Sequence, residues 1–114
     1  MKMSDVIKKL KLVALSPYDE DIEIKGAYSS DLLSDVIANS NEGQLWITLQ
    51  GHENVIAVAV LNDLAGVIVS GGFTPNPNTV SKAVEKGIAL FTSDQNSYQL
   101  SGELYQLLQS KDDQ

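Results

Sequence analysis

The sequence predicts an α/β fold with a mostly parallel sheet and helices on both faces. From Ser30 onward, short apolar stretches typical of strands alternate with longer stretches typical of helices. The interval from Gly51 to Gly66 is long enough for the crossover that joins two parallel strands. No internal repeat, linker or low-complexity tract interrupts the chain, so we expect residues 1–114 to form a single domain.

A helix and two strands are expected at the start of the chain. Ser4 can cap a helix that begins at Asp5 and carries its apolar residues on one face. Residues 10–16 are apolar enough for a first strand, and the acidic stretch 18–26 predicts a polar turn and an edge strand.

The next two elements are a helix and a buried strand. Ser30 can cap the helix, whose first turn then carries Asp31, and residues 39–43 end it. Leu32, Leu33, Val36 and Ile37 would form its apolar face. Residues 44–49 are rich in β-branched and aromatic side chains and predict a strand closed by Gly51.

Seven consecutive apolar residues at 55–61 fit either a strand by β-propensity or a buried helix by length. The parallel arrangement requires a crossover here, so we predict a helix. It is expected to bury Val55, Ile56, Val58, Ala59 and Val60.

Two strands and a capped helix follow. Residues 66–72 read as a strand that stops at a glycine pair. Asn76 caps the next helix, Pro77 takes its first position and Gly87 ends it. Its inward face is predicted to hold Val80, Ala83 and Val84, and residues 88–94 form another strand.

The last helix carries leucines at helical spacing and two tyrosines on one face. Its apolar positions are Leu100, Leu104, Leu107 and Leu108. Tyr98 and Tyr105 suit core packing or a partner surface, so a homodimer is possible. Residues 110–114 are expected to fray.

The composition argues against several partners. Fifteen acidic and eight basic residues give a net charge of −7, which opposes binding to nucleic acid or to an anionic membrane. Without cysteine there is no thiolate nucleophile and no cysteine-based zinc site. No signal-peptide pattern and no stretch of about 20 apolar residues are present, so we expect a cytoplasmic protein.

From about Gly26 to the last helix, the chain resembles a DRTGG domain. The helix "SSDLLSDV", the strand ending at Gly51, the apolar helix, the Gly71-Gly72 pair and the strand "EKGIALFTS" follow the family's order. The resemblance implies a fold similar to the N-terminal domains of HPr kinase/phosphorylase and of the Mur ligases. DRTGG domains also occur in regulatory parts of phosphotransacetylases and of CBS-containing pyrophosphatases, which implies sensing or assembly rather than catalysis.

Two motifs depart from the family's pattern. Many members have Gly-Asp-Arg where this chain has Gly51-His52-Glu53, and Thr-Gly-Gly where it has Ser70-Gly71-Gly72. Serine keeps the hydroxyl, but the missing arginine removes a bidentate anion donor. A small or mostly neutral ligand is therefore favoured over a multiply charged nucleotide.

Ligands of open α/β sheets bind beyond the carboxyl ends of the strands, so we expect any site at that edge. The Gly71-Gly72 pair either brings backbone N–H groups to an anion, together with the Ser70 hydroxyl, or only supplies positive φ at a turn. His52 is either a ligand contact or a surface residue that opens a helix. The predicted ligand-binding residues are Asp31, Gly51, His52, Glu53, Ser70, Gly71 and Gly72.

No catalytic constellation is evident in the sequence. A GxxxxGK[ST] loop for the phosphates of ATP is missing, and Asp31 and Asp35 have no third partner for a metal. We therefore expect a non-catalytic regulatory module without cofactor or metal, which binds a small molecule or a regulatory protein. The alternatives are a phosphotransfer-related enzyme or accessory subunit that uses His52 and Ser70, and a ligand-free assembly protein.

Overall fold

The computed structural model describes residues 1–110, which form five strands and five helices. The strands are β1 (Val13–Ala14), β2 (Gly26–Ser29), β3 (Gln44–Thr48), β4 (Gly66–Val69) and β5 (Leu90–Thr92). The helices are α1 (Met3–Leu10), α2 (Leu33–Asn39), α3 (Asn54–Leu61), α4 (Pro77–Lys86) and α5 (Ser97–Ser110).

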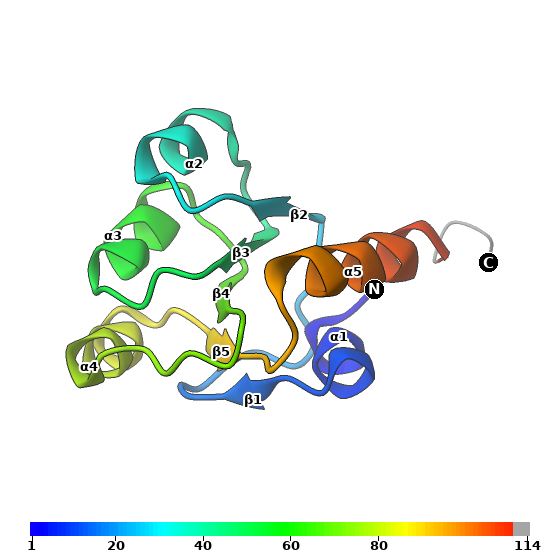
Figure 1. Ribbon diagram of the computed structural model, residues 1–114, viewed down its shortest axis with the longest axis horizontal. Coiled ribbons are helices and arrows are strands. Elements are labelled where there is room, and N and C mark those ends of the chain that lie inside the picture. Colours follow the sequence, from blue (N-terminus) through cyan, green and yellow to red (C-terminus); the bar gives the residue numbers. More distant parts are fainter. Residues whose placement is uncertain (111–114) are drawn as a thin grey trace.

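One mostly parallel sheet organises the described residues, as predicted. Its strand order is β1-β5-β4-β3-β2, with β2 to β5 parallel and β1 antiparallel to β5. Helices α2, α3 and α4 lie on one side of the sheet, and α1 and α5 lie on the other (Figure 1). The expected α/β fold with helices on both faces is therefore confirmed.

Each face of the sheet carries its own core, because successive side chains of a strand point to opposite faces. In β3, Leu45 and Ile47 belong to the core under α1 and α5, whereas Trp46 belongs to the core under α2, α3 and α4. Trp46 is fully buried, and its indole N–H donates to the Ser30 carbonyl at 2.8 Å. Strand β3 thus contributes side chains to both cores.

Residues 54–61 form helix α3, so the interpretation as a crossover helix is confirmed. Val55, Ile56, Val58 and Ala59 are buried as predicted. The prediction for Val60 is wrong, since this side chain is 48% exposed. Helix α3 packs against one face of the sheet, so only part of its circumference is buried.

The start of the chain differs from the prediction at two points. Helix α1 begins at Met3 and Ser4 does not cap it, because the Met3 and Ser4 N–H groups donate to the carbonyls of Ile22 and Glu20. Backbone carbonyls of segment 20–22 therefore accept the hydrogen bonds that a capping side chain would otherwise accept. The prediction of an edge strand within residues 18–26 is also wrong in its position. Within residues 18–25 only Glu23 forms an isolated bridge, and the edge strand is β2, which begins at Gly26.

Helix α2 starts later than predicted, and Ser30 does not cap it. It begins at Leu33, and the Ser30 hydroxyl accepts the Leu32 N–H at 3.2 Å. Asp31 lies outside the helix, so its expected place in the first turn is wrong. Val36 is buried and Leu33 is partly buried, but Leu32 and Ile37 are exposed because α2 contacts the core along a narrow strip.

The two C-terminal helices largely follow the sequence pattern. Asn76 and Pro77 open α4 as predicted, although the Asn76 side chain makes no capping bond, and Gly87 ends the helix in the left-handed region at φ 71°. Ala83 is buried and Val80 partly so, but Val84 is exposed.

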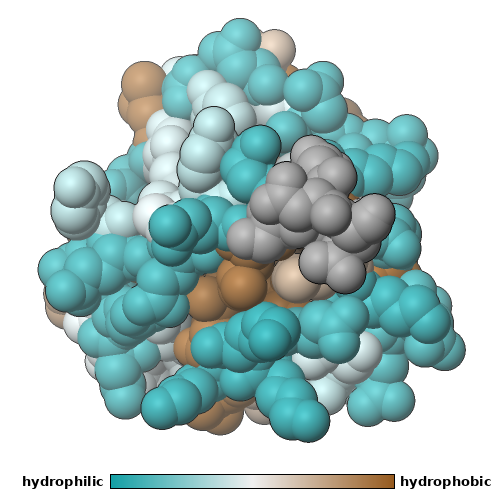
Figure 2. All heavy atoms as spheres, turned by 90° about the vertical axis from the view of Figure 1, so that its right-hand side faces the viewer, coloured by the Kyte–Doolittle hydropathy of each residue, from teal (hydrophilic) through white to brown (hydrophobic). Residues whose placement is uncertain are grey.

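In α5, Leu100 and Leu104 are buried, and Leu107 and Leu108 pack partly against the same core. Tyr98 and Tyr105 are exposed, Tyr98 by 88%, so the core-packing interpretation of these two side chains is wrong. The side of the molecule with α1 and α5 is largely hydrophilic, with a small apolar area near the centre of the view (Figure 2). The predicted fraying concerns residues 110–114, of which Ser110 is the last residue of α5 and residues 111–114 lie outside the described residues.

Within residues 1–110, no helix combines the length and apolar character needed to cross a bilayer.

Candidate functional site

The carboxyl edge of the parallel strands brings the predicted site residues to one side of the sheet. Asp31 follows β2, Gly51-His52-Glu53 follows β3, and Ser70-Gly71-Gly72 follows β4. The loops are joined to one another: the Asp31 carboxylate accepts hydrogen bonds from the Thr48 hydroxyl at 2.9 Å and from the Leu49 N–H at 2.7 Å. Asp31 therefore has a structural role that links β2 to β3.

The glycine pair forms a corner with positive φ, at 78° for Gly71 and 75° for Gly72. The Gly71 N–H donates to the Gln95 carbonyl at 2.7 Å, and the Gly72 N–H donates to the Ser93 carbonyl at 2.9 Å. Both donors are thus used within the chain. The expectation that they are free to bind an anion is wrong for this conformation, and the conformational role of the two glycines is confirmed.

Ser70 is fully buried beneath this corner. Its N–H donates to the Thr48 carbonyl at 2.9 Å, and its hydroxyl shares a hydrogen bond of 2.6 Å with the Ser97 hydroxyl. The hydroxyl therefore does not face a ligand in this conformation, contrary to the expected donor role. Sequence reasoning missed Ser97, although its position after β5 at the start of α5 places it at the same edge.

His52 is exposed at the start of α3. Its Nδ1 accepts the Asn54 N–H at 3.1 Å, and its carbonyl accepts the Val55 N–H. The ring thus satisfies one of the N–H groups that a helix start leaves unpaired. No hydrogen bond of the described residues joins His52 to Ser70, so the two do not form a base–nucleophile pair here.

Gly51 anchors the loop after β3 to the start of α4. Its carbonyl accepts the Asn76 N–H at 3.1 Å and the Thr79 hydroxyl at 2.6 Å. A Cβ at this position would come within 3.1 Å of the Pro75 Cα, so the close approach of the two loops favours glycine. Glu53 occupies the N-cap position of α3 and makes no capping bond with its side chain.

The connections after β4 and β5 leave the sheet towards opposite faces, since α4 lies on one side and α5 on the other (Figure 1). Such a divergence is where open α/β sheets bind ligands. Here the bonds from Gly71 and Gly72 to residues 93–95 close the space between the loops. Any ligand therefore binds on the surface of these loops or opens them.

Two exposed apolar side chains flank the glycine corner, which sequence reasoning did not single out. Leu49 is 43% exposed and Phe73 is 57% exposed. Both lie 3.2 Å from the position of a Cβ on Gly71, so they border the same point of the surface. Together with the exposed Gly72 backbone, they offer a small apolar surface at the carboxyl edge.

A hollow of about 470 Å³ adjoins this edge at the end of β5. Gly72 lies next to it, because a Cβ there would be 4.0 Å from the Asp94 carboxylate. The Gln95 Oε1 atom is buried, and it has no hydrogen-bond partner among the described residues. The lining consists of Lys9, Leu10, Lys11, Ser93, Asp94, Gln95 and Glu103.

Asp35 belongs to a separate polar cluster on α2. Hydrogen bonds from Ser30, Asn39 and Tyr28 lower the pKa of the Asp35 carboxyl, and the bond from the Tyr28 hydroxyl, 2.9 Å long, raises the pKa of that tyrosine. Asp31 and Asp35 thus have different partners. Within the described part of the chain, no group of three or more acidic or histidine side chains is placed to hold a metal.

Tyr28→Phe should bring the pKa of Asp35 closer to its ordinary value. Because the folded-state pKa is lowered, the ionised carboxylate stabilises the fold above the ordinary aspartate pKa, and this contribution is lost as the pH falls through the lowered value. The carboxyl-carbon chemical shift of Asp35, followed against pH, measures the change. Tyr18→Phe is the control, and an identical Asp35 titration in both variants would contradict the assignment.

Comparison with known proteins adds a likeness of fold. No family model matches the sequence, and no curated protein matches it. The fold is similar to the crystal structure of the CBS and DRTGG domains of the regulatory region of Clostridium perfringens pyrophosphatase, complexed with its activator diadenosine tetraphosphate. The TM-score is 0.69 at 16% identity, over 90% of this chain and 45% of that chain. The chain thus shares an α/β fold with part of that structure and covers less than half of that chain's length.

Proposed function

We propose that residues 1–114 form one DRTGG-like regulatory domain, which binds a small ligand at the carboxyl edge and does not catalyse a reaction. The order of motifs from Gly26 onward supports the family assignment, and the likeness to a regulatory region supports the fold that it implies. In the neighbour's regulatory region a nucleotide activator is bound, which favours sensing as the role of such a region.

The state of Ser70 is the observation that carries the non-catalytic proposal. A nucleophile has to be exposed to its substrate and activated by a base. Ser70 is fully buried and bonded to Ser97, while His52 uses Nδ1 to hold the start of α3. The two residues of the enzymatic alternative are thus occupied by structural bonds.

The ligand would contact the loops that carry Asp31, Gly51-His52-Glu53 and Ser70-Gly71-Gly72. Leu49 and Phe73 extend this surface with apolar contacts, and the hollow beside Gly72 extends it towards β5. Lys9 and Lys11 bring positive charge to this hollow, where the carboxyl groups of Asp94 and Glu103 oppose it. We propose a small metabolite that is neutral or singly charged, in keeping with the net charge of −7.

Gln95 offers a way to transmit ligand binding. Its side chain lines the hollow and donates to Glu103 at 2.8 Å, while its carbonyl accepts the Gly71 N–H. A ligand that provides an N–H donor for the unpaired Oε1 atom would reposition Gln95. The movement would reach the glycine corner and the apolar side chains around it.

Gly72→Asn tests the site by placing a side chain over the corner. Asparagine tolerates the left-handed region better than other non-glycine residues, so the fold should persist. We expect a ligand found by calorimetry among central metabolites and nucleotides, diadenosine tetraphosphate included, to lose at least about tenfold in affinity, or about 1.4 kcal/mol.

Gly87→Asn is the matched control, since Gly87 has a similar φ of 71° and a Cβ there meets nothing within 4 Å. It should leave the affinity unchanged. Equal affinities of both variants would place the ligand elsewhere. Turnover of labelled ATP that His52→Ala abolishes would instead establish the enzymatic alternative.

A further inference from the structure

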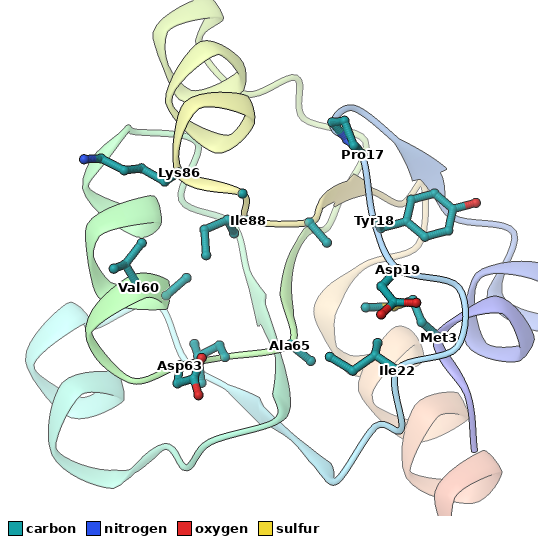
Figure 3. Close-up of a pocket in the computed structure, with 14 residues that line it drawn as sticks. Met3, Pro17, Tyr18, Asp19, Ile22, Val60, Asp63, Ala65, Lys86 and Ile88 are labelled. Atoms are coloured by element: carbon teal, nitrogen blue, oxygen red, sulfur yellow. The ribbon is translucent and has the colours of Figure 1, made fainter.

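A second hollow of about 320 Å³ lies at the opposite, amino-terminal edge of the sheet (Figure 3). It is bordered by the turn between α3 and β4, by the turn between α4 and β5, and by segment 17–22. None of the predicted ligand-binding residues lines it. Its volume falls at the lower end of the range for small-molecule pockets.

The floor of this hollow is partly apolar. Met3, Leu64 and Ala89 line it and are buried, and Val60 from α3 and Ile88, which precedes β5, add further apolar side chains. Burial of a short aliphatic chain on such a floor is favourable by about 0.8 kcal/mol for each methylene group. The hollow therefore suits a ligand with a short apolar stem.

The rim of the hollow is negative. It contains the carboxylates of Asp19 and Asp63, and the ammonium group of its one lysine, Lys86, points away from the centre (Figure 3). Helices α3 and α4 also end there, and the C-terminal end of a helix carries partial negative charge. The carboxyl edge, by contrast, receives the N-terminal ends of these helices.

Asp63 is held in place by its backbone. It adopts φ 54°, its N–H donates to the Val60 carbonyl at 3.2 Å, and its carbonyl accepts the Gly43 N–H at 3.0 Å. Its carboxylate makes no hydrogen bond or ion pair within residues 1–110. Asp19 is partly oriented, since one of its oxygens accepts the Asp21 N–H at 2.9 Å.

We propose that this hollow binds an alkylammonium group, with the stem on the apolar part of the floor and the charge at the rim that carries Asp19 and Asp63. The group could belong to a free small amine or to a lysine side chain of a partner protein, because both present the same chemistry. The site is independent of the ligand site at the carboxyl edge.

Titration of the ¹⁵N-labelled protein with n-butylammonium chloride at constant ionic strength tests the site. We expect saturable amide shifts at residues 63–65 and 87–89, with no comparable shifts at residues 70–73. Butan-1-ol has the same stem without charge, and butyrate has the opposite charge. Equal effects of n-butylammonium and either probe, or shifts that do not saturate, would overturn the proposal.

Asp19→Asn and Asp63→Asn keep the shape of each side chain, and asparagine tolerates the φ of residue 63. Each should weaken n-butylammonium binding by about two- to fivefold, as expected for the loss of one charge contact between exposed groups. Asp94→Asn, at the other edge, and Lys86→Gln should not weaken it. Unchanged affinity in both rim variants would contradict the proposed role of the carboxylates.

A lysine-containing peptide and its norleucine counterpart identify the source of the group. Tighter binding of the lysine peptide than of n-butylammonium would support the site and assign it to a partner's lysine. Binding of n-butylammonium alone would support the site as one for a free amine. Equal binding of the two peptides, together with no saturable n-butylammonium shift, would overturn the proposal.

Discussion

Trp46→Ala should lower the free energy of unfolding by about 3–5 kcal/mol, the range for truncating a large buried aromatic side chain. The indole is fully buried in the core under α2, α3 and α4, and its N–H donates to the Ser30 carbonyl. The substitution removes both the packing and the bond. Equilibrium unfolding in urea, followed by circular dichroism, measures the change.

Trp46→Phe separates the two contributions, because it retains most of the apolar volume and loses the N–H donor. It should be less destabilising than Trp46→Ala, with a remaining loss of about 1–3 kcal/mol for the unpaired carbonyl and the smaller ring. A loss below about 1 kcal/mol for Trp46→Ala would contradict the position of this side chain at the centre of its core.

Ala59→Pro should destabilise the protein by about 3 kcal/mol or more, because proline removes a helical hydrogen bond and clashes with the preceding turn. Ala59 is fully buried inside α3, and its carbonyl also accepts the Leu64 N–H at 3.0 Å where the chain turns towards β4. The same urea unfolding experiment applies.

Ala59→Gly provides the control for helix propensity and for the loss of one methyl group, with an expected loss of roughly 1 kcal/mol for propensity alone. If the proline variant were no less stable than the glycine variant, residues 54–61 would not depend on helical hydrogen bonds. That result would contradict the crossover between β3 and β4.

Local sequence patterns were sufficient for most of the fold. The length of the interval between Gly51 and Gly66 required a crossover, and this identified α3 although its residues have high β-propensity. Gly87 and Pro77 marked the limits of α4 because each is suited to one end of a helix. The β-branched and aromatic side chains of residues 44–49 predicted strand β3.

The remaining differences come from contacts between segments that are distant in the chain. Ser4 was a reasonable cap by type, but carbonyls from segment 20–22 take the N–H groups of the first turn of α1. Likewise, the sequence placed Gly71 and Gly72 at the carboxyl edge, whereas their acceptors come from the loop after β5. A local pattern contains no information on which distant carbonyl satisfies a free donor.

The amide spectrum of the ¹⁵N-labelled protein with its best-binding metabolite tests the proposed ligand site most directly. The proposal predicts saturable shifts at Gly51, His52, residues 70–73 and residues 93–95, with changes in the protection of the Gly71 and Gly72 N–H groups from hydrogen exchange. If none of these amides shifted and the shifts were confined to another surface, such as the exposed side of α5, the proposed ligand site would be contradicted.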